Sequence, residues 1–196
     1  MIKLLLASNN KGKYDELVGA FEAVGIELIY DGELNLVEDS PTLELNAITK
    51  AQAASAQRNM FSMSDDTGFF IPALDGFPGV HANRWMPGDW KAKRDAILKM
   101  IEGKADRRAF LLSKFAVSTP SGKIIGQHEV KNWYEIGFED HVRQGHETFG
   151  YNPILIMQGY HIGDLTNEQR YFLKNRGRHA AEVKEELLRE FASRLE

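Results

Sequence analysis

An apolar run near the start of the chain passes directly into a polar segment and then into an amphipathic stretch. Ile2–Ala7 is apolar, and Ser8-Asn9-Asn10-Lys11-Gly12-Lys13 follows it. Apolar residues then recur at helical spacing as far as Val24, where Gly25 breaks the pattern. This order predicts a buried strand that leads at once into a helix over Lys11–Val24. A strand–loop–helix start favours an α/β fold.

The polar segment between the predicted strand and helix has the chemistry of an anion-binding loop. Backbone N–H groups at a helix start point toward a ligand, and the ammonium groups of Lys11 and Lys13 would neutralise its charge. An ordinary capped helix with solvated lysines is the alternative interpretation. This segment alone does not decide between the two.

Composition excludes several classes of protein. A length of 196 residues predicts a single domain over residues 1–196, with room for a sizeable core. The net charge of −4 gives no basic footprint, so we expect no nucleic-acid partner. The absence of cysteine excludes disulfides and thiolate metal sites and fits a cytoplasmic protein. The apolar start is too short for a signal peptide, and we expect no membrane span.

Along the chain, strand-like and helix-like segments alternate and then give way to a hairpin. Further strands are expected at Ile26–Tyr30, Phe69–Ile71 and Ile154–Met157, and helices at Pro41–Asn59, Trp90–Ile101 and Ala180–Leu195. The β-rich runs Phe110–Ser118 and Lys123–Tyr134 flank Thr119-Pro120-Ser121-Gly122, which is a hairpin signal. The pattern predicts an α/β fold with a mixed sheet and a second lobe.

Two pairs of adjacent acidic residues are candidate cation ligands. Asp65-Asp66 precedes Thr67-Gly68 and is expected at a turn before the β-rich run, and Glu38-Asp39 lies in a loop before the long helix. Neighbouring carboxylates repel each other, so a site that keeps both ionised usually holds a cation or serves a catalytic step. The alternatives are a turn capped by aspartate and a solvated loop.

Two clusters near the end of the chain are candidates for binding a flat ligand and its phosphates. Thr148-Phe149-Gly150-Tyr151-Asn152-Pro153 could present an aromatic face on which a nucleobase would stack, or could be an aromatic turn of the core. Lys174-Asn175-Arg176-Gly177-Arg178-His179 combines cations with amide donors. It could reach phosphates or purine edges, or mark a break between two helices at Gly177.

Taken together, these segments resemble the Ham1-like family of nucleoside-triphosphate pyrophosphatases, which hydrolyse inosine and xanthosine triphosphates. The resemblance covers nearly the whole chain and keeps the order of the motifs. The matching segments are Ser8-x-Asn10-x-x-Lys13, Asn46-Ala47-x-x-Lys50-Ala51, Asp65-Asp66-Thr67-Gly68, Ala73-Leu74-Asp75-Gly76-Phe77-Pro78-Gly79-Val80 with Ala82-x-Arg84, Phe149-Gly150-Tyr151-Asn152-Pro153-Ile154 and Arg176-Gly177.

The resemblance implies an α/β fold with an elongated mixed sheet, two lobes and an active-site cleft between them. It also implies a homodimer that uses Mg²⁺ to convert a nucleoside triphosphate and water into the monophosphate and pyrophosphate. The triphosphate would be held by Ser8, Asn10, Lys13 and Lys50. The metal would be held by Glu38 and Asp66 with Asp65, and Asp66 would also be the catalytic residue. The remaining substrate-binding positions would be Thr67, Phe149, Gly150, Tyr151, Asn152, Arg170, Asn175 and Arg176.

The chain departs from the family pattern at three of the positions that would bind the base, which we call the base end of the site. Asn152 stands where relatives usually carry Asp, Asn175 where they carry His, and Arg170 where they carry Lys. An amide offers both a donor and an acceptor, so the hydrogen bonds demanded of the base could change. The phosphate- and metal-binding motifs are intact, so hydrolysis of a nucleoside triphosphate is expected, with inosine- and xanthosine-type triphosphates as the first candidates that the resemblance implies. A pyrophosphatase for another modified or pyrimidine nucleotide, and a nucleotide-binding module without turnover, remain the alternatives.

Overall fold

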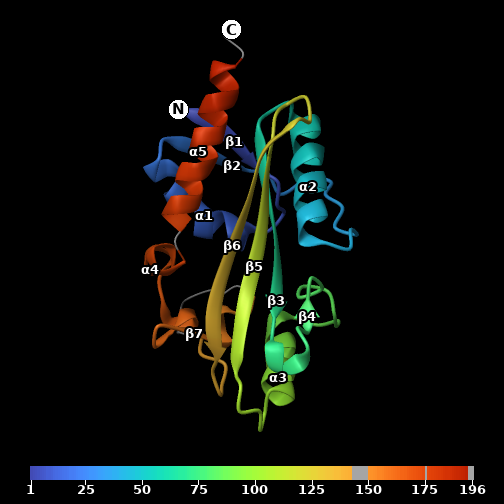
Figure 1. Ribbon diagram of the computed structural model, residues 1–196, viewed down its shortest axis with the longest axis vertical. Helices are drawn as coiled ribbons and strands as arrows, with labels where there is room; N and C mark the ends of the chain where they lie inside the picture. The colour runs from blue at the N-terminus through green and yellow to red at the C-terminus, as the bar shows by residue number, and fades with distance from the viewer. Residues whose placement is uncertain (143–149, 175, 194–196) are drawn as a thin grey trace. The chain divides into compact units, whose positions relative to one another are not determined.

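The computed structural model describes residues 1–142, 150–174 and 176–193, which form an α/β fold with a mixed sheet (Figure 1). The strands are β1 Ile2–Leu6, β2 Ile26–Tyr30, β3 Ser62–Phe70, β4 Pro78–Gly79, β5 Arg108–Ser118, β6 Ile124–Ile136, β7 Leu155–Met157 and β8 Tyr160–His161. The α-helices are α1 Lys11–Ala23, α2 Leu43–Arg58, α3 Trp90–Met100, α4 Asn167–Leu173 and α5 Arg176–Ala192. The sheet order is β2-β1-β3-β5-β6-β7-β8, and β4 pairs with β3.

The chain separates into two compact units. Unit 1 comprises Met1–Asp66, Ser113–Val130 and Lys174–Glu196, and unit 2 comprises Thr67–Leu112 and Lys131–Leu173. The strands β3, β5 and β6 contribute residues to both units. Among the helices of the described residues, none has the length and hydrophobicity that a membrane span requires.

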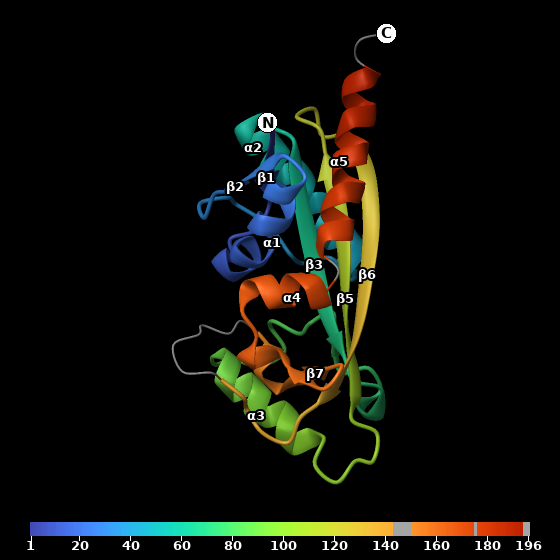
Figure 2. The same cartoon turned by 90° about the vertical axis from the view of Figure 1, so that its left-hand side faces the viewer.

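In unit 1, β1 lies between β2 and β3, and both neighbours run parallel to it. Leu4, Leu5 and Leu6 are at most 1% exposed, which explains the uninterrupted apolar run, because a parallel strand covered on both faces has no solvent side. Helices α1 and α5 pack side by side (Figure 2). The amide of Ala7 donates to the carbonyl of Met63 at 2.7 Å, so the polar segment after β1 runs beside the acidic pair in β3.

Helix α2 packs a face of small residues into the core of unit 1. Ala47, Ala51 and Ala54 on this face are at most 1% exposed. The hydroxyls of Ser62 and Ser64 in β3 donate to the carbonyls of Ala51 and Ala47, respectively. Close approach of helix and strand therefore allows polar residues to be buried in β3 with their hydrogen bonds satisfied.

In unit 2, short antiparallel pairings and an aromatic core hold the polypeptide together. Strand β4 pairs with the end of β3, and β7 pairs with β6 and β8. The rings of Phe69 and Tyr151 stack with their centroids 4.4 Å apart. The Tyr151 hydroxyl donates to the carbonyl of Ala82 at 2.7 Å and accepts from Nε1 of Trp85 at 2.8 Å. Burial raises the pKa of this hydroxyl to about 12, so it stays a neutral donor.

Most predicted elements are confirmed, including the hairpin of β5 and β6, whose turn closes with Gly122 donating to Thr119. The acidic pair, however, was expected at a turn, and it lies inside the nine-residue strand β3. The first half of β3 reads Ser-Met-Ser-Asp-Asp and lacks apolar alternation, so its burial depends on the hydroxyl contacts with α2.

The C-terminal region also differs from the prediction. Helix α4 was not predicted, because its seven residues are too few for a clear period. Helix α5 begins at Arg176, before the predicted start at Ala180, and Gly177 lies in its first turn. Glycine is tolerated there because the first turn of a helix has few hydrogen bonds to lose.

Candidate functional site

Charged side chains from four segments of unit 1 meet in one place. The segments are the start of α1, the loop before α2, α2 itself and β3. We call the group the lysine–carboxylate cluster. It consists of Lys13, Glu38, Lys50, Asp65 and Asp66. Three carboxylates face two ammonium groups, so the cluster keeps an excess of negative charge at neutral pH.

Lys50 lies at the centre of the cluster. It is 1% exposed, and its Nζ donates to Glu38 Oε1 at 2.7 Å, to the Asp65 carbonyl at 2.7 Å and to Asp66 Oδ1 at 3.3 Å. An ammonium group has three donors, so the buried charge is fully satisfied. Burial acts to lower the pKa of Lys50, but the surrounding carboxylates outweigh it and the pKa is raised. Lys50 therefore stays protonated, and its ammonium group lies among carboxylates.

Glu38 extends from the loop before α2, and its side chain is 40% exposed. Burial acts to raise the pKa of Glu38, but attraction to Lys50 and Lys13 more than offsets it, so the pKa is lowered. The neighbouring helix is positioned by Thr42, whose Oγ1 accepts from the Leu45 amide at 3.2 Å as an N-cap. Glu38 thus offers a charged oxygen that is open to solvent on one side and held by Lys50 on the other.

The second lysine comes from the segment between β1 and α1. Lys13 Nζ lies 3.0 Å from Asp65 Oδ1. Asn10 is the N-cap of α1, and its side chain accepts from the Lys13 amide at 3.4 Å. The Ser8 hydroxyl in turn accepts from the Asn10 amide at 3.2 Å. The capped helix is therefore present, Lys13 pairs with Asp65 instead of being solvated, and anion binding by this segment stays a prediction.

The two carboxylates that face Lys50 are those of Glu38 and Asp66, and they fit a hard cation that takes its other ligands from water and substrate. Within the described residues, no group of three or more His, Asp or Glu side chains is arranged to hold a metal ion. Mg²⁺ is usually bound by one or two carboxylates, with waters and substrate phosphates as its other ligands. Glu38 and Asp66 are oxygen donors of that kind, so the cluster fits a metal that arrives with a phosphate substrate. Asp65 is engaged by Lys13 instead.

One residue at this site was part of a matching motif, but sequence analysis gave it no role. Asn46 is fully buried, and its Nδ2 donates to Asp66 Oδ2 at 2.9 Å. It lies four residues before Lys50 on α2, so both side chains share one face of the helix. The four-residue spacing between Asn46 and Lys50 was the sequence signal for this residue. It lies within a motif already noted for Lys50.

The residues expected to bind the base lie partly outside the described residues. Phe149 and Asn175 fall outside them, and nothing of the Arg176 side chain is described. In unit 2, Thr67 is partly buried in β3, Asn152 is buried in a short 3₁₀ turn, and Arg170 is buried in α4.

The described part of the aromatic motif is anchored within unit 2. Arg94 Nη1 donates to the Gly150 carbonyl at 3.0 Å, and its Nη2 lies 2.9 Å from Asp140 Oδ2. Tyr151 packs as a core residue, through its stacked ring and its two hydroxyl hydrogen bonds. The core-turn interpretation therefore applies to Tyr151, and Arg94 fixes the backbone at Gly150.

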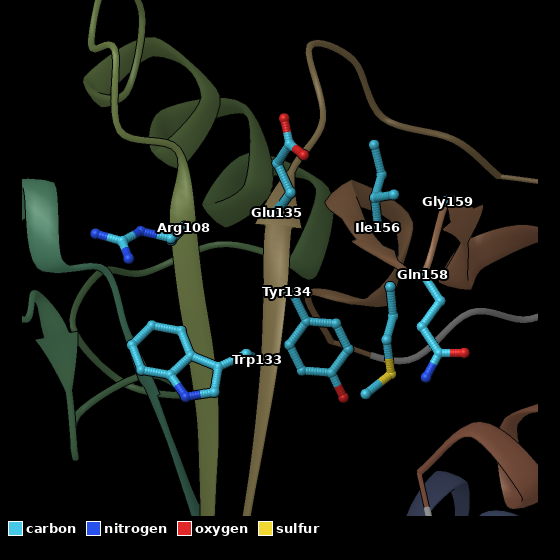
Figure 3. A pocket seen from close by; sticks show the side chains of 8 residues that line it. Arg108, Trp133, Tyr134, Glu135, Ile156, Gln158 and Gly159 are labelled. Atoms are coloured by element: carbon cyan, nitrogen blue, oxygen red, sulfur yellow. The ribbon is translucent and has the colours of Figure 1, made fainter.

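A hollow of about 420 Å³ is present elsewhere in unit 2 (Figure 3). It is lined by residues of β5, β6 and β7 and of the turn after β7, namely Arg108, Trp133, Tyr134, Glu135, Ile156, Met157, Gln158 and Gly159. None of the candidate site residues is among them, so the hollow is not part of the lysine–carboxylate cluster.

The chain is similar to known proteins over almost its full length. Residues 4–186 match the sequence model of the Ham1 family. A protein of Symbiobacterium thermophilum named dITP/XTP pyrophosphatase is 34% identical over 190 residues, which are 94% of each chain. A Methanosarcina acetivorans protein of the same name is 34% identical over 199 residues, covering 99% of this chain and 100% of the relative. A solved HAM1 protein from Coxiella burnetii shares the fold, with a TM-score of 0.78 over 96% of this chain and 100% of that chain at 24% identity.

Proposed function

The chain belongs to the Ham1 family, and we propose that it is a nucleoside-triphosphate pyrophosphatase acting on non-canonical purine nucleotides such as inosine, deoxyinosine and xanthosine triphosphates. The observation that carries this proposal is the buried Lys50 ammonium, held among Glu38, Asp65 and Asp66 with Lys13 beside them. The names of the relatives support the substrate class. Since the family match spans residues 4–186, we propose one functional domain that includes both units.

The proposed roles follow from the charges of the cluster. Lys13 and Lys50 would bind the triphosphate, together with the polar groups of Ser8 and Asn10. For Lys50 this means exchanging carboxylate oxygens for phosphate oxygens, and the negative charge of either set of oxygens favours its ammonium form. Release of pyrophosphate breaks the bond between the α-phosphorus and the bridging oxygen, and a water oxygen forms the new bond to phosphorus.

Glu38 and Asp66 would hold Mg²⁺, with Asp65 as a further carboxylate that keeps Lys13 in place. When bound, the metal supplies positive charge that neutralises the triphosphate. Asp66 would orient the attacking water and accept its proton. Carboxylates are weak bases compared with the hydroxide that the attacking water would become, so most of the effect comes from positioning the water.

The base would be read in the segment around Gly150, Tyr151 and Asn152, together with Thr67, Phe149, Arg170, Asn175 and Arg176. We further propose a cytoplasmic homodimer that needs neither nucleic acid nor a membrane partner. The family resemblance supports the homodimer, the absence of cysteine fits the cytoplasm, and the net charge of −4 argues against a nucleic-acid partner.

A panel of triphosphates tests the function and its metal. Each of inosine, xanthosine, adenosine, guanosine, cytidine and uridine triphosphate is incubated with the protein and Mg²⁺, and pyrophosphate and orthophosphate are measured separately. We expect pyrophosphate with the purine analogues, and no turnover in excess chelator until Mg²⁺ or Mn²⁺ is restored. A pyrimidine preference would favour the alternative pyrophosphatase, nucleotide binding without release would favour the binding module, and full activity in chelator would contradict the metal.

The base end gives a second prediction, because three positions depart from the family pattern there. Restoring the usual residues with Asn152→Asp and Asn175→His should shift preference toward inosine and xanthosine triphosphates. Loss or gain of one hydrogen bond in a buried site changes discrimination by about 1–3 kcal/mol. The measurement is the ratio of kcat/KM for inosine triphosphate to that for the best native substrate. An unchanged ratio in the folded double variant would show that these two positions do not read the base.

A further inference from the structure

Asn46 bridges the two segments that carry the proposed metal carboxylates. Its Nδ2 donates to Asp66 Oδ2 at 2.9 Å, and its Oδ1 accepts from the Ser40 amide at 3.0 Å. Ser40 lies two residues after Glu38 in the loop before α2. One buried amide therefore contacts both β3 and this loop.

The orientation of the Asn46 amide is determined by its partners. A backbone N–H can only donate, so the Asn46 oxygen must face Ser40. The NH₂ group then faces Asp66 and also lies 3.5 Å from the Ser40 carbonyl. No flipped arrangement satisfies both sides, and the contact with Asp66 is fixed as a donated hydrogen bond to a carboxylate.

The two oxygens of Asp66 consequently have different partners. Oδ1 faces the Lys50 ammonium at 3.3 Å, and Oδ2 accepts from Asn46. Lys50 and Asn46 come from successive turns of α2, so this helix fixes both ends of the carboxylate and its rotation. Asn46 is not needed as a helix cap, because Thr42 caps α2.

We propose that Asn46 is a positioning residue. It holds Asp66 and the loop that carries Glu38 so that the carboxylates of Asp66 and Glu38 face the same metal ion. This inference rests on the proposed function. Without Asn46, Asp66 could rotate and the loop would lose its anchor at Ser40, although every charged residue of the cluster would remain. Partners that orient metal ligands in this way typically change metal affinity or activity by about 10- to 100-fold when they are removed.

The test compares Asn46→Leu, which keeps the number and branching of the side-chain heavy atoms but makes no hydrogen bond, with Ser55→Ala as a matched control. Ser55 is also fully buried on α2, but its hydroxyl contacts Gln52 and Ser118 instead of the cluster. Mn²⁺ affinity is measured by electron paramagnetic resonance, with the metal alone and with inosine triphosphate carrying a methylene bridge between its α- and β-phosphorus atoms. Thermal unfolding of each variant identifies the folded fraction, and Asn46→Ala replaces the leucine variant if that one does not fold.

We expect Asn46→Leu to weaken Mn²⁺ binding by about 10- to 100-fold and to lower kcat while KM changes little, because Lys13 and Lys50 still bind phosphate. Ser55→Ala should retain the Mn²⁺ affinity of the wild type. Unchanged Mn²⁺ affinity in the Asn46 variant, or an equal loss in Ser55→Ala, would overturn the inference. The binding measurement needs no turnover, so a wild-type protein that binds Mn²⁺ but releases no pyrophosphate would refute the proposed function and still test Asn46.

Discussion

Replacing Asp66 by asparagine is expected to reduce pyrophosphate release by about 10²- to 10⁴-fold, the range that a positioned acid–base group contributes. Nucleotide binding should largely survive, because the cationic contacts of Lys13 and Lys50 remain. The amide of the variant offers only one oxygen, so it can serve Lys50 or Asn46 but not both. Some loss of stability should therefore accompany the loss of turnover.

Single-turnover assays and equilibrium binding of a non-hydrolysable triphosphate separate the two effects of Asp66→Asn. The control is Asp15→Asn, because Asp15 is 41% exposed and pairs only with the exposed Lys11 among the contacts seen here. This control should keep wild-type turnover. A folded Asp66→Asn protein with near-normal rates would mean that Asp66 neither binds the metal nor handles the proton.

The sequence places both lysines near the acidic residues, because these residues lie in short contiguous motifs, and their roles toward phosphate and metal stay predictions. A strand followed directly by a capped helix places Lys13, and helical spacing places Lys50. The sequence did not predict that Asp65 and Asp66 lie within a strand. Their segment reads as a polar turn, and only tertiary hydrogen bonds to α2 make its burial possible.

The sequence also did not predict which carboxylate of the cluster pairs with which lysine. Asp65 and Asp66 are adjacent and chemically alike, and three carboxylates could pair with two lysines in several ways. In the strand β3, neighbouring side chains point to opposite faces, so Asp65 meets Lys13 from α1 while Asp66 meets Lys50 from α2. Asn46 was given no role for a similar reason, because an amide carries no charge and its spacing to Lys50 indicates only a shared helix face.

Replacing Lys50 tests whether its ammonium group is needed to offset the charge of the carboxylates when no substrate is bound. Lys50→Met keeps an unbranched side chain but leaves Glu38 and Asp66 without their shared cation. Removing one partner of a buried ion pair typically lowers the free energy of unfolding by about 3–5 kcal/mol, and we expect a loss of this order at pH 7. Turnover should be lost as well, since Lys50 is a proposed phosphate ligand.

The pH dependence of this loss gives the test its specificity. In the wild type the lowered pKa of Glu38 contributes stability above the unfolded-state pKa, and this contribution is lost as pH falls through the folded-state pKa. In Lys50→Met the two Lys50 interactions that lower the pKa of Glu38 are lost, and burial and the repulsion of Asp65 act against the remaining attraction to Lys13, so protonation relieves the variant. The stability gap between wild type and variant should therefore narrow as pH falls from about 7 to about 4.

Denaturant unfolding at a series of pH values measures this gap, with Lys93→Met as the control. Lys93 is also buried, but its Nζ donates to the Gly88 carbonyl at 2.7 Å, so its loss should not depend on carboxylate protonation. Mg²⁺ without nucleotide should restore part of the stability of Lys50→Met and should stabilise the wild type less, because there Lys50 competes with the metal for Glu38 and Asp66. A pH-independent gap together with no response to Mg²⁺ would show that these carboxylates do not form the proposed cation site.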